Sequence, residues 1–256
     1  MVWFLESLTA SIIPNAPLRI KPKLAPAWGA EVVSSNIVGY EKITLSPGLN
    51  MIGNQFVAVG GTAFKNINDM FVDSSQITAG ADDGEADSIL RWTGNGYGEV
   101  YYYDDLDVAW ESVDDPGVAA ETTFAPGEGV WYKCAAEQAI TTTLAGEVPS
   151  GETYTVQIQP GLNFVANPYP MGICPNTANF SVEGIVAGAD DGEADSILMW
   201  TGSGYGNIYY YDDLDVAWES VDNPGVAIDE AILEPAKGFW YKHQGEGATI
   251  TFGKPY

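Results

Sequence analysis

Short runs in which apolar and polar residues alternate follow one another along this chain. VVSSNIVGYEKITL (32–45) alternates and carries β-branched residues, and EVYYYD (99–104) is dominated by aromatic ones. Both patterns are typical of strands with one buried face. Alternation places Tyr101 and Tyr103 on one face of their strand and Tyr102 on the other, so only one of these sets can line a given core.

Glycine and proline mark the turns between these strands. PGLN precedes an apolar strand twice, at 47–50 and 160–163, and TGNGYG (93–98) separates two aromatic runs. Such glycine-rich steps predict a β-hairpin, because glycine adopts positive φ without steric cost. NINDMFVDS (66–74) predicts one or two helical turns and is the only helical segment that we expect.

The most informative pattern is an internal repeat. Residues 79–118 and 187–226 differ at only five of 40 positions. The differing pairs are Arg91/Met199, Asn95/Ser203, Glu99/Asn207, Val100/Ile208 and Asp115/Asn223. Weaker matches flank this block, Ile43–Phe56 with Val156–Tyr169 and Phe124–Lys133 with Leu233–Lys242. A repeat of this kind predicts two copies of one folding unit.

We therefore predict an all-β protein of two tandem homologous β-sandwich-like units related by internal duplication. Each unit is expected to hold about six or seven strands. The predicted boundaries are 1–30 for a leader-like or disordered segment, 31–148 for the first β unit and 149–256 for the second.

A family resemblance points the same way. PGLNFVANPYP (160–170), a W-T-G-x-G-Y strand pair and the FWYK strand are similar to extracellular β-modules of Bacteroidota surface and type IX-secreted proteins. VVSSNIVGYEKITLSPGLNMIGNQF (32–56) resembles secreted proteins of Verrucomicrobia. The resemblance covers nearly all of 31–256 and implies a β fold outside the cell, with no catalytic residues. Asn54-Gln55-Phe56 replaces its Asn-Pro-Tyr, which predicts a differently built loop in the first copy.

The chain is strongly acidic. The chain has 35 acidic residues against 10 Lys and Arg, a formal net charge of −25. DNA, RNA and anionic lipid all attract basic surfaces, so we expect no nucleic-acid partner and no docking on such lipid. Beyond the N-terminus no apolar run reaches the roughly 18 residues of a membrane helix, so no membrane insertion is expected. The acidic excess indicates a solvated surface or one loaded with cations.

The N-terminus and the cysteines bear on the compartment. Residues 1–30 combine apolar residues, three basic residues and a small-residue exit at Ala25-Pro26-Ala27, although three prolines interrupt them. This ending resembles a signal-peptide cleavage region, so we expect a secreted or cell-surface protein. Cys134 and Cys174 could form one bridge between the two copies or remain free buried thiols.

The acidic segment AGADDGEADSIL, present at 79–90 and 187–198, is a candidate calcium site. Its carboxylates are Asp82, Asp83, Glu85 and Asp87, and in the second copy Asp190, Asp191, Glu193 and Asp195. Calcium takes six to eight such oxygens from a flexible segment. A second cluster, Asp104–Asp107 with its copy Asp212–Asp215, could complete the site if the two meet. The spacing is not that of an EF-hand, and solvated turns built from Asp and Gly explain the same residues.

The repeated aromatic residues are candidate carbohydrate-binding residues. The positions concerned are Trp92, Tyr97 and Trp110, and in the second copy Trp200, Tyr205 and Trp218. Exposed aromatic rings beside carboxylates stack on sugar faces. The same residues can instead form the core of a β protein. A binding role predicts that Trp110 and Trp218 are exposed at similar places.

No catalytic group stands out. The one histidine, His243, has no nominated nucleophile, and 35 acids make any carboxylate pair uninformative. We therefore expect a non-catalytic extracellular or cell-surface structural or interaction protein, with glycans or other surface proteins as partners. A carbohydrate-binding protein, calcium-assisted in one version, is the alternative, and a glycoside-active enzyme is the third hypothesis. Apart from calcium, we expect no cofactor.

Overall fold

The computed structural model describes residues 37–60 and 63–256, so the leader-like segment lies outside it. Within these residues strands dominate, which confirms the all-β prediction. The segment 66–74 contains a single helical turn, α1 (Ile67–Met70), capped by the side chain of Asn66.

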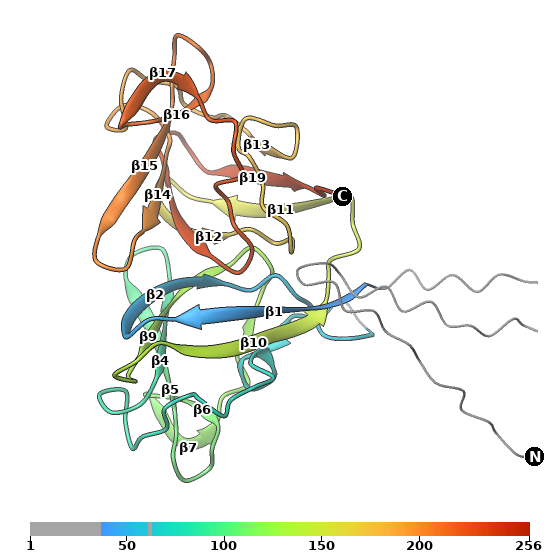
Figure 1. Cartoon of the computed structure of the whole chain (residues 1–256), viewed down its shortest axis with the longest axis vertical. Helices are drawn as coiled ribbons and strands as arrows, with labels where there is room; N and C mark the ends of the chain where they lie inside the picture. Colours follow the sequence, from blue (N-terminus) through green and yellow to red (C-terminus); the bar gives the residue numbers. More distant parts are fainter. Residues whose placement is uncertain (1–36, 61–62) are drawn as a thin grey trace, which may run out of the picture.

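Two large antiparallel sheets contain most of the strands (Figure 1). The first has the order β2 (Gly48–Gly53), β9 (Gly129–Cys134), β4 (Ser88–Trp92), β5 (Tyr97–Tyr103), β6 (Trp110–Ser112) and β7 (Asp115–Ala119). The second has the order β12 (Gly161–Ala166), β18 (Gly238–His243), β14 (Ser196–Trp200), β15 (Tyr205–Tyr211), β16 (Trp218–Ser220) and β17 (Asn223–Ala227). Corresponding strands of the sequence repeat thus occupy corresponding places in the two sheets.

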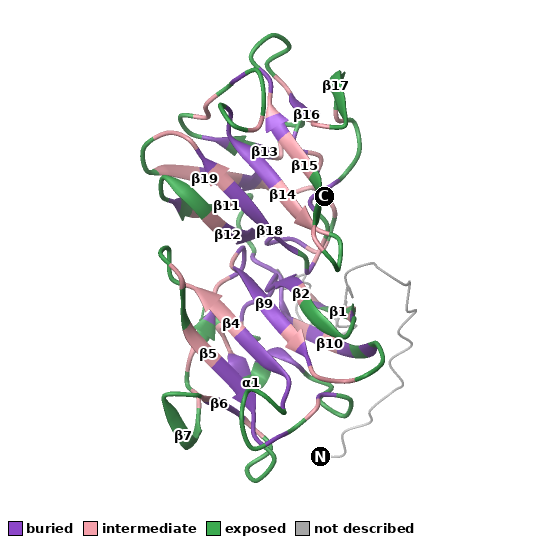
Figure 2. Cartoon of the chain, turned by 90° about the vertical axis from the view of Figure 1, so that its left-hand side faces the viewer, coloured by how far each residue is buried: buried purple, intermediate pink, exposed green. Residues whose placement is uncertain are grey.

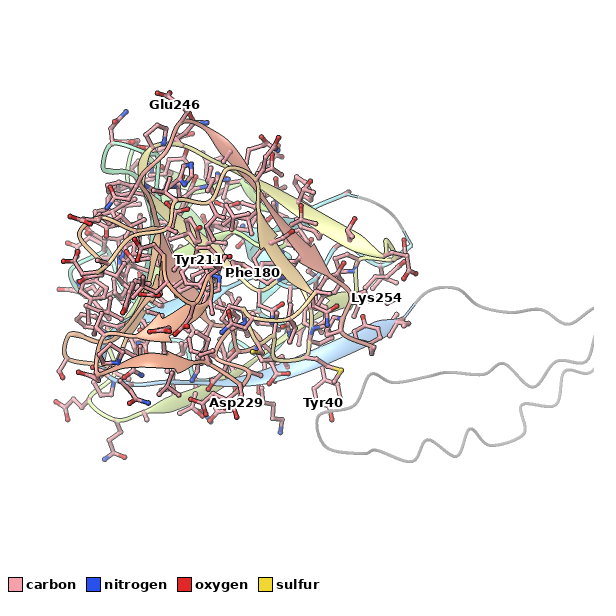
Figure 3. The ribbon with its side chains drawn as sticks, turned by 90° about the horizontal axis from the view of Figure 1, so that it is seen from above. Tyr40, Phe180, Tyr211, Asp229, Glu246 and Lys254 are labelled. Carbon is pink, nitrogen blue, oxygen red and sulfur yellow. The ribbon has the colours of Figure 1, made fainter. Side chains whose placement is uncertain are left out.

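Smaller sheets complete the cores. They pair β1 (Val38–Leu45) with β10 (Ile140–Glu147), β3 (Lys65–Asn66) with β8 (Thr123–Phe124), and β19 (Ala248–Gly253) with both β11 (Thr153–Ile158) and β13 (Phe180–Val182). Seen from above, Phe180 and Tyr211 lie inside the molecule, whereas Glu246 lies at its edge (Figure 3).

Local sequence explains the main turns. Gly48 and Gly161, in the two PGLN turns, have φ of 83° and 87°, a region that glycine adopts without strain. The predicted hairpin joins β4 to β5 through Gly94, whose φ is 97°. Tyr101 and Tyr103 belong to the main core, while Tyr102 is buried on the other face beside Glu111, as alternation predicts.

The two large sheets meet along four inner strands, β2 and β9 of the first and β12 and β18 of the second (Figure 2). Their backbone contacts come in matched pairs. The amide of Gly53 donates to Ala236 O at 3.0 Å, and the amide of Ala166 donates to Gly127 O at 2.9 Å. Gly53 corresponds to Ala166 in the aligned strands, so each contact is the counterpart of the other.

Tryptophans pack around this contact in the same paired manner. Trp92 meets Trp240 edge-on at 5.1 Å between ring centroids, and Trp131 meets Trp200 at 5.2 Å. The indole of Trp92 donates to Leu162 O at 3.1 Å, and the indole of Trp200 donates to Leu49 O at 2.9 Å. Edge-to-face aromatic pairs contribute about 0.5–1.5 kcal/mol each beyond their buried area.

At the centre of the contact, the backbones of β2 and β12 lie too close together for both strands to carry a Cβ atom at the facing positions. A Cβ atom on Gly53 would lie 2.1 Å from Cβ of Ala166. One position must therefore be glycine, although the two positions correspond in the repeat. Gly129 and Gly238 are restricted in the same way, since a Cβ there would meet the ring of Phe164 at 2.4 and 2.8 Å.

We predict that Gly53→Ala destabilises the protein by about 1–3 kcal/mol, the usual cost of overpacking. Adding Ala166→Gly removes the clashing methyl group and should restore most of the loss. Urea unfolding of the wild type, both single variants and the double variant measures the coupling. Gly96→Ala, where no atom lies within 4 Å of the new Cβ, serves as the control. Additive effects of the two substitutions would contradict the close contact.

Candidate functional site

The acidic segments are ordered turns. Asp82 Oδ1 accepts the amide hydrogen of Gly84 at 2.8 Å and of Glu85 at 3.2 Å, so this carboxylate caps its own turn. Asp190 caps the second copy with the same distances, 2.8 and 3.2 Å. Such local bonds are the ordinary reason for Asp and Gly in turns.

The last acid of each segment is buried and points into the fold. Asp87 accepts the phenol of Tyr132 at 2.6 Å and the amide of Ala135 at 2.6 Å. Asp195 accepts the phenol of Tyr241 at 2.7 Å and the amide of Gln244 at 2.8 Å. Each buried carboxylate therefore ties its segment to β9 or β18.

The predicted metal ligands do not converge. Asp83 and Glu85 are exposed, Asp82 is used within its turn, and Asp87 is directed into the core. The second copy distributes its four carboxylates in a similar way, with Asp195 buried and Glu193 exposed. As a set, these residues form the framework of a turn.

The histidine and the cysteines have structural surroundings. His243 is 2% exposed and its Nδ1 lies 2.9 Å from Asp195 Oδ2. Cys134 takes the corresponding place in β9, and both Cys134 and Cys174 are free. His243 and Cys134 are thus buried within the fold at corresponding positions of β18 and β9.

Trp110 and Trp218 are buried, so the exposure that a binding role predicted for them is contradicted and the alternative, that they form the core, is confirmed. Each is 2% exposed and packs in the main core, Trp110 against Tyr132 and Trp218 against Tyr241. Fully burying a large apolar side chain stabilises the fold by about 1.5–3 kcal/mol. This gain explains why both indoles lie in the core.

The four remaining aromatic candidates lie at the contact between the large sheets. Trp92 and Trp200 form the edge-on pairs described above. The phenols of Tyr97 and Tyr205 accept the indole hydrogens of Trp131 at 2.7 Å and Trp240 at 2.8 Å. Alternation could not show this role, since the partners come from other strands.

An ion-pair network lies beside the contact between the sheets, where Glu128 forms a β-bridge with Val165 of β12. Arg91 makes two parallel bonds to Glu128, from Nε and from Nη2, and binds Glu99 at 3.1 Å. The guanidinium also lies 5.2 Å from the ring centroid of Phe124. Bidentate pairs of this kind fix geometry more strongly than single contacts do. We call Arg91, Glu99 and Glu128 the Arg91 network.

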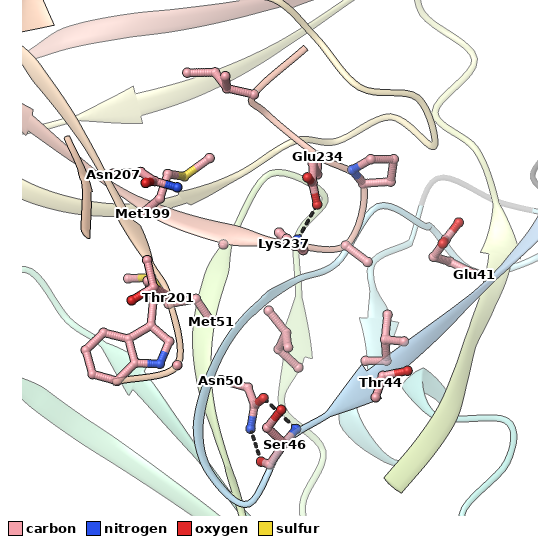
Figure 4. A pocket seen from close by; sticks show the side chains of 18 of the residues that line it. Glu41, Thr44, Ser46, Asn50, Met51, Met199, Thr201, Asn207, Glu234 and Lys237 are labelled. Atoms are coloured by element: carbon pink, nitrogen blue, oxygen red, sulfur yellow. Dashed lines mark hydrogen bonds and ion pairs between the residues drawn. The ribbon is translucent and has the colours of Figure 1, made fainter. Parts of the chain in front are cut away.

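The corresponding side has no such network and contains a groove (Figure 4). Met199, Asn207 and Lys237 stand where the Arg91 network has Arg91, Glu99 and Glu128. All three line a groove of about 830 Å³, and Lys237 pairs with Glu234 instead. This volume is in the range of small-ligand sites.

The groove combines an aromatic wall with polar groups. Trp200 and Tyr209 line it together with Asn50, Glu41 and Glu230. Burial raises the pKa of the Glu41 carboxyl, and burial together with Glu230 raises the pKa of the Tyr209 phenol. The sequence signal for this site was two of the five differences between the copies, at 91/199 and 99/207.

Comparison with protein-family models, with curated proteins and with solved structures gives no match. The resemblance to Bacteroidota and Verrucomicrobia modules therefore stays a prediction. Among the residues that the structure describes, no helix has the length and apolar character needed to cross a membrane.

We predict that stability falls as the pH rises above about 10, the ordinary pKa of tyrosine. Burial, reinforced by Asp87 and Asp195, raises the pKa of Tyr132 and of Tyr241 far above that value. Above pH 10 the unfolded chain loses these protons while the folded chain keeps them, so alkali favours unfolding by about 1.4 kcal/mol per pH unit for each tyrosine.

Urea midpoints measured from pH 8 to about 11 test this linkage. The Tyr132→Phe/Tyr241→Phe variant should be less stable at pH 8, because each buried aspartate loses a donor, and should lose less stability in alkali. An unchanged slope in this variant would show that the two phenols do not carry the linkage.

Proposed function

We propose that this chain is a non-catalytic extracellular or cell-surface interaction protein built from two homologous sandwich-like units, 31–148 and 149–256. The observation that carries the proposal is the groove beside Met199, Asn207 and Lys237. Its lining includes the three positions that correspond to Arg91, Glu99 and Glu128, which form the Arg91 network in the other copy.

The duplication is supported by sequence and geometry together. Two blocks that differ at five of 40 positions occupy corresponding strands of sheets with the same order. Duplication gives both copies the same strands at this place. Sequence divergence at three side chains then gives an ion-pair network in one copy and groove-lining residues in the other.

The chemistry of the groove favours binding over catalysis. Its acids, Glu41, Glu230 and Glu234, lie on a surface with no histidine or cysteine among the lining residues. The buried His243 lies outside this lining. A rigid wall with a few polar groups is typical of a binding site.

A carbohydrate is the ligand class that the groove favours. Trp200 and Tyr209 offer aromatic surface for the apolar face of a sugar ring, and Asn50, Asn207 and Glu230 offer amide and carboxylate groups for its hydroxyls. The net charge of −25 argues for a neutral or cationic glycan over an acidic one.

We predict that the wild-type chain binds a neutral or cationic glycan on a glycan array, run with and without calcium. The Met199→Arg/Asn207→Glu/Lys237→Glu variant rebuilds the Arg91 network in the groove and should lose at least tenfold in affinity, about 1.4 kcal/mol. Its unfolding free energy should stay within about 1 kcal/mol of the wild type, since partly exposed ion pairs contribute little.

The reverse substitution on the other side is the matched control. Arg91→Met/Glu99→Asn/Glu128→Lys changes the same three residue types and should leave glycan affinity at the groove unchanged. Full affinity in the rebuilt variant would place the site elsewhere, and an array without any bound glycan would reject the carbohydrate ligand. Recovery of a bound oligosaccharide in cleaved form would contradict a non-catalytic role.

A further inference from the structure

The loops that join β5 to β6 and β15 to β16 each place two carboxylates beside a glutamate of the strand that follows, which makes a cluster of three. We call Asp104–Glu111 and Asp212–Glu219 the aspartate loops. In the first, one carboxylate oxygen each from Asp104, Asp107 and Glu111 lie within 4.8 Å of one another. The second places Asp212, Asp215 and Glu219 in the same arrangement, with the same burial pattern.

One oxygen in each cluster is buried without a hydrogen-bond partner. Glu111 is 0% exposed, and its Oε2 accepts the amide of Gly117 at 2.6 Å and the phenol of Tyr102 at 3.3 Å. Its Oε1 has no partner among the described residues. Leaving a buried carboxylate oxygen unpaired is costly unless a cation or a proton compensates it.

The corresponding oxygen of Glu219 is also unpartnered. Glu219 is 0% exposed, its Oε2 accepts the amide of Gly225 and the phenol of Tyr210, and its Oε1 has no described partner. The same carboxylate oxygen lacks a hydrogen-bond partner in both copies, so the unpaired oxygen is a property of the loop.

The other two carboxylates remain available to a ligand. Asp104 Oδ1 accepts hydrogen bonds from the amides of Leu106 and Asp107 at 2.7 and 3.0 Å. These bonds orient the carboxylate through Oδ1 and leave Oδ2 to face a ligand. Asp107 is exposed, so water reaches the cluster from its side. The salt bridges of the described residues involve Arg91, Lys237 and His243, and none of them reaches these loops.

We propose that each aspartate loop binds one divalent cation, Ca²⁺ in preference to Mg²⁺, through Asp104, Asp107 and Glu111 and through Asp212, Asp215 and Glu219. All ligands are hard oxygens, and one of the three carboxylates in each cluster is exposed. Ca²⁺ accepts irregular geometry, whereas Mg²⁺ requires near-octahedral geometry and loses its bound water reluctantly. Water completes the coordination from the exposed side.

This site takes two ligands per loop from the second acidic cluster that the sequence singled out, and none from the AGADDGEADSIL segments. Its key ligands, Glu111 and Glu219, lie outside both AGADDGEADSIL segments and follow a tryptophan within a strand. The segments are nevertheless neighbours, because Gly80 pairs with Asp104 and Gly188 with Asp212. The proposal stands on the loops alone and does not depend on the groove or on its ligand.

Calorimetric titration of the chelator-treated full chain with CaCl₂ tests the proposal. We expect two sites per chain and a rise in Tm that EDTA reverses, with MgCl₂ at least tenfold weaker. Glu111→Gln should leave one site, and Glu111→Gln/Glu219→Gln should leave none. Asp107→Asn, at an exposed position, is a second variant that keeps the test valid if the buried substitution impairs folding, and it should weaken its site at least tenfold.

Glu85→Gln and Glu193→Gln are the matched controls, since they remove charges of the neighbouring segments without touching the clusters. They should leave both sites intact. The proposal would be overturned if Ca²⁺ gave neither heat nor a Tm shift up to about 10 mM, roughly ten times the weakest dissociation constants of extracellular sites. It would equally be overturned by Ca²⁺ binding that survives in the Glu111→Gln/Glu219→Gln variant, or by a Tm that responds to protonation below pH 6 but not to Ca²⁺.

Discussion

The close backbone contact of β2 and β9 with β12 and β18 is the constraint on which the rest of the structure depends. Gly53 faces Ala166 where two methyl groups cannot fit, and Gly129 and Gly238 admit the ring of Phe164. Glycine at these positions lets the strands approach, and the approach lets Trp92 and Trp200 each reach a backbone carbonyl of the other sheet. The large sheets therefore pack as one body.

A paired contact makes two corresponding sides, and side-chain chemistry distinguishes them. Arg91 pairs with Glu99 and Glu128 on one side, whereas Met199 cannot form ion pairs with Asn207 or Lys237, and these three residues line a groove. The far ends of the sheets keep their common features, including both aspartate loops. The repeated sequence thus accounts for the features that the two large sheets share, and a few differences within the repeat account for where they differ.

Sequence patterns predicted the strands, the hairpins and the two faces of the tyrosine strand, because these depend on local periodicity and on glycine. They left open whether Trp110 and Trp218 lie in the core or at the surface, and they did not predict the contact of Trp92 with Trp240. These outcomes depend on which strands pack together, and periodicity carries no information on that. Two of the five differences between the copies fall at the groove, but only the fold showed that positions 199 and 207 line one surface.

Hydrogen exchange at the amides of Gly53 and Ala166 tests the central contact most directly. Both donate across it, to Ala236 O and Gly127 O. If the sheets form one body, these amides exchange only through global unfolding, as slowly as amides in the middle of β4 and β14. Exchange many times faster than in those strands, with the strands themselves still protected, would show that the sheets separate before they unfold and would contradict this account.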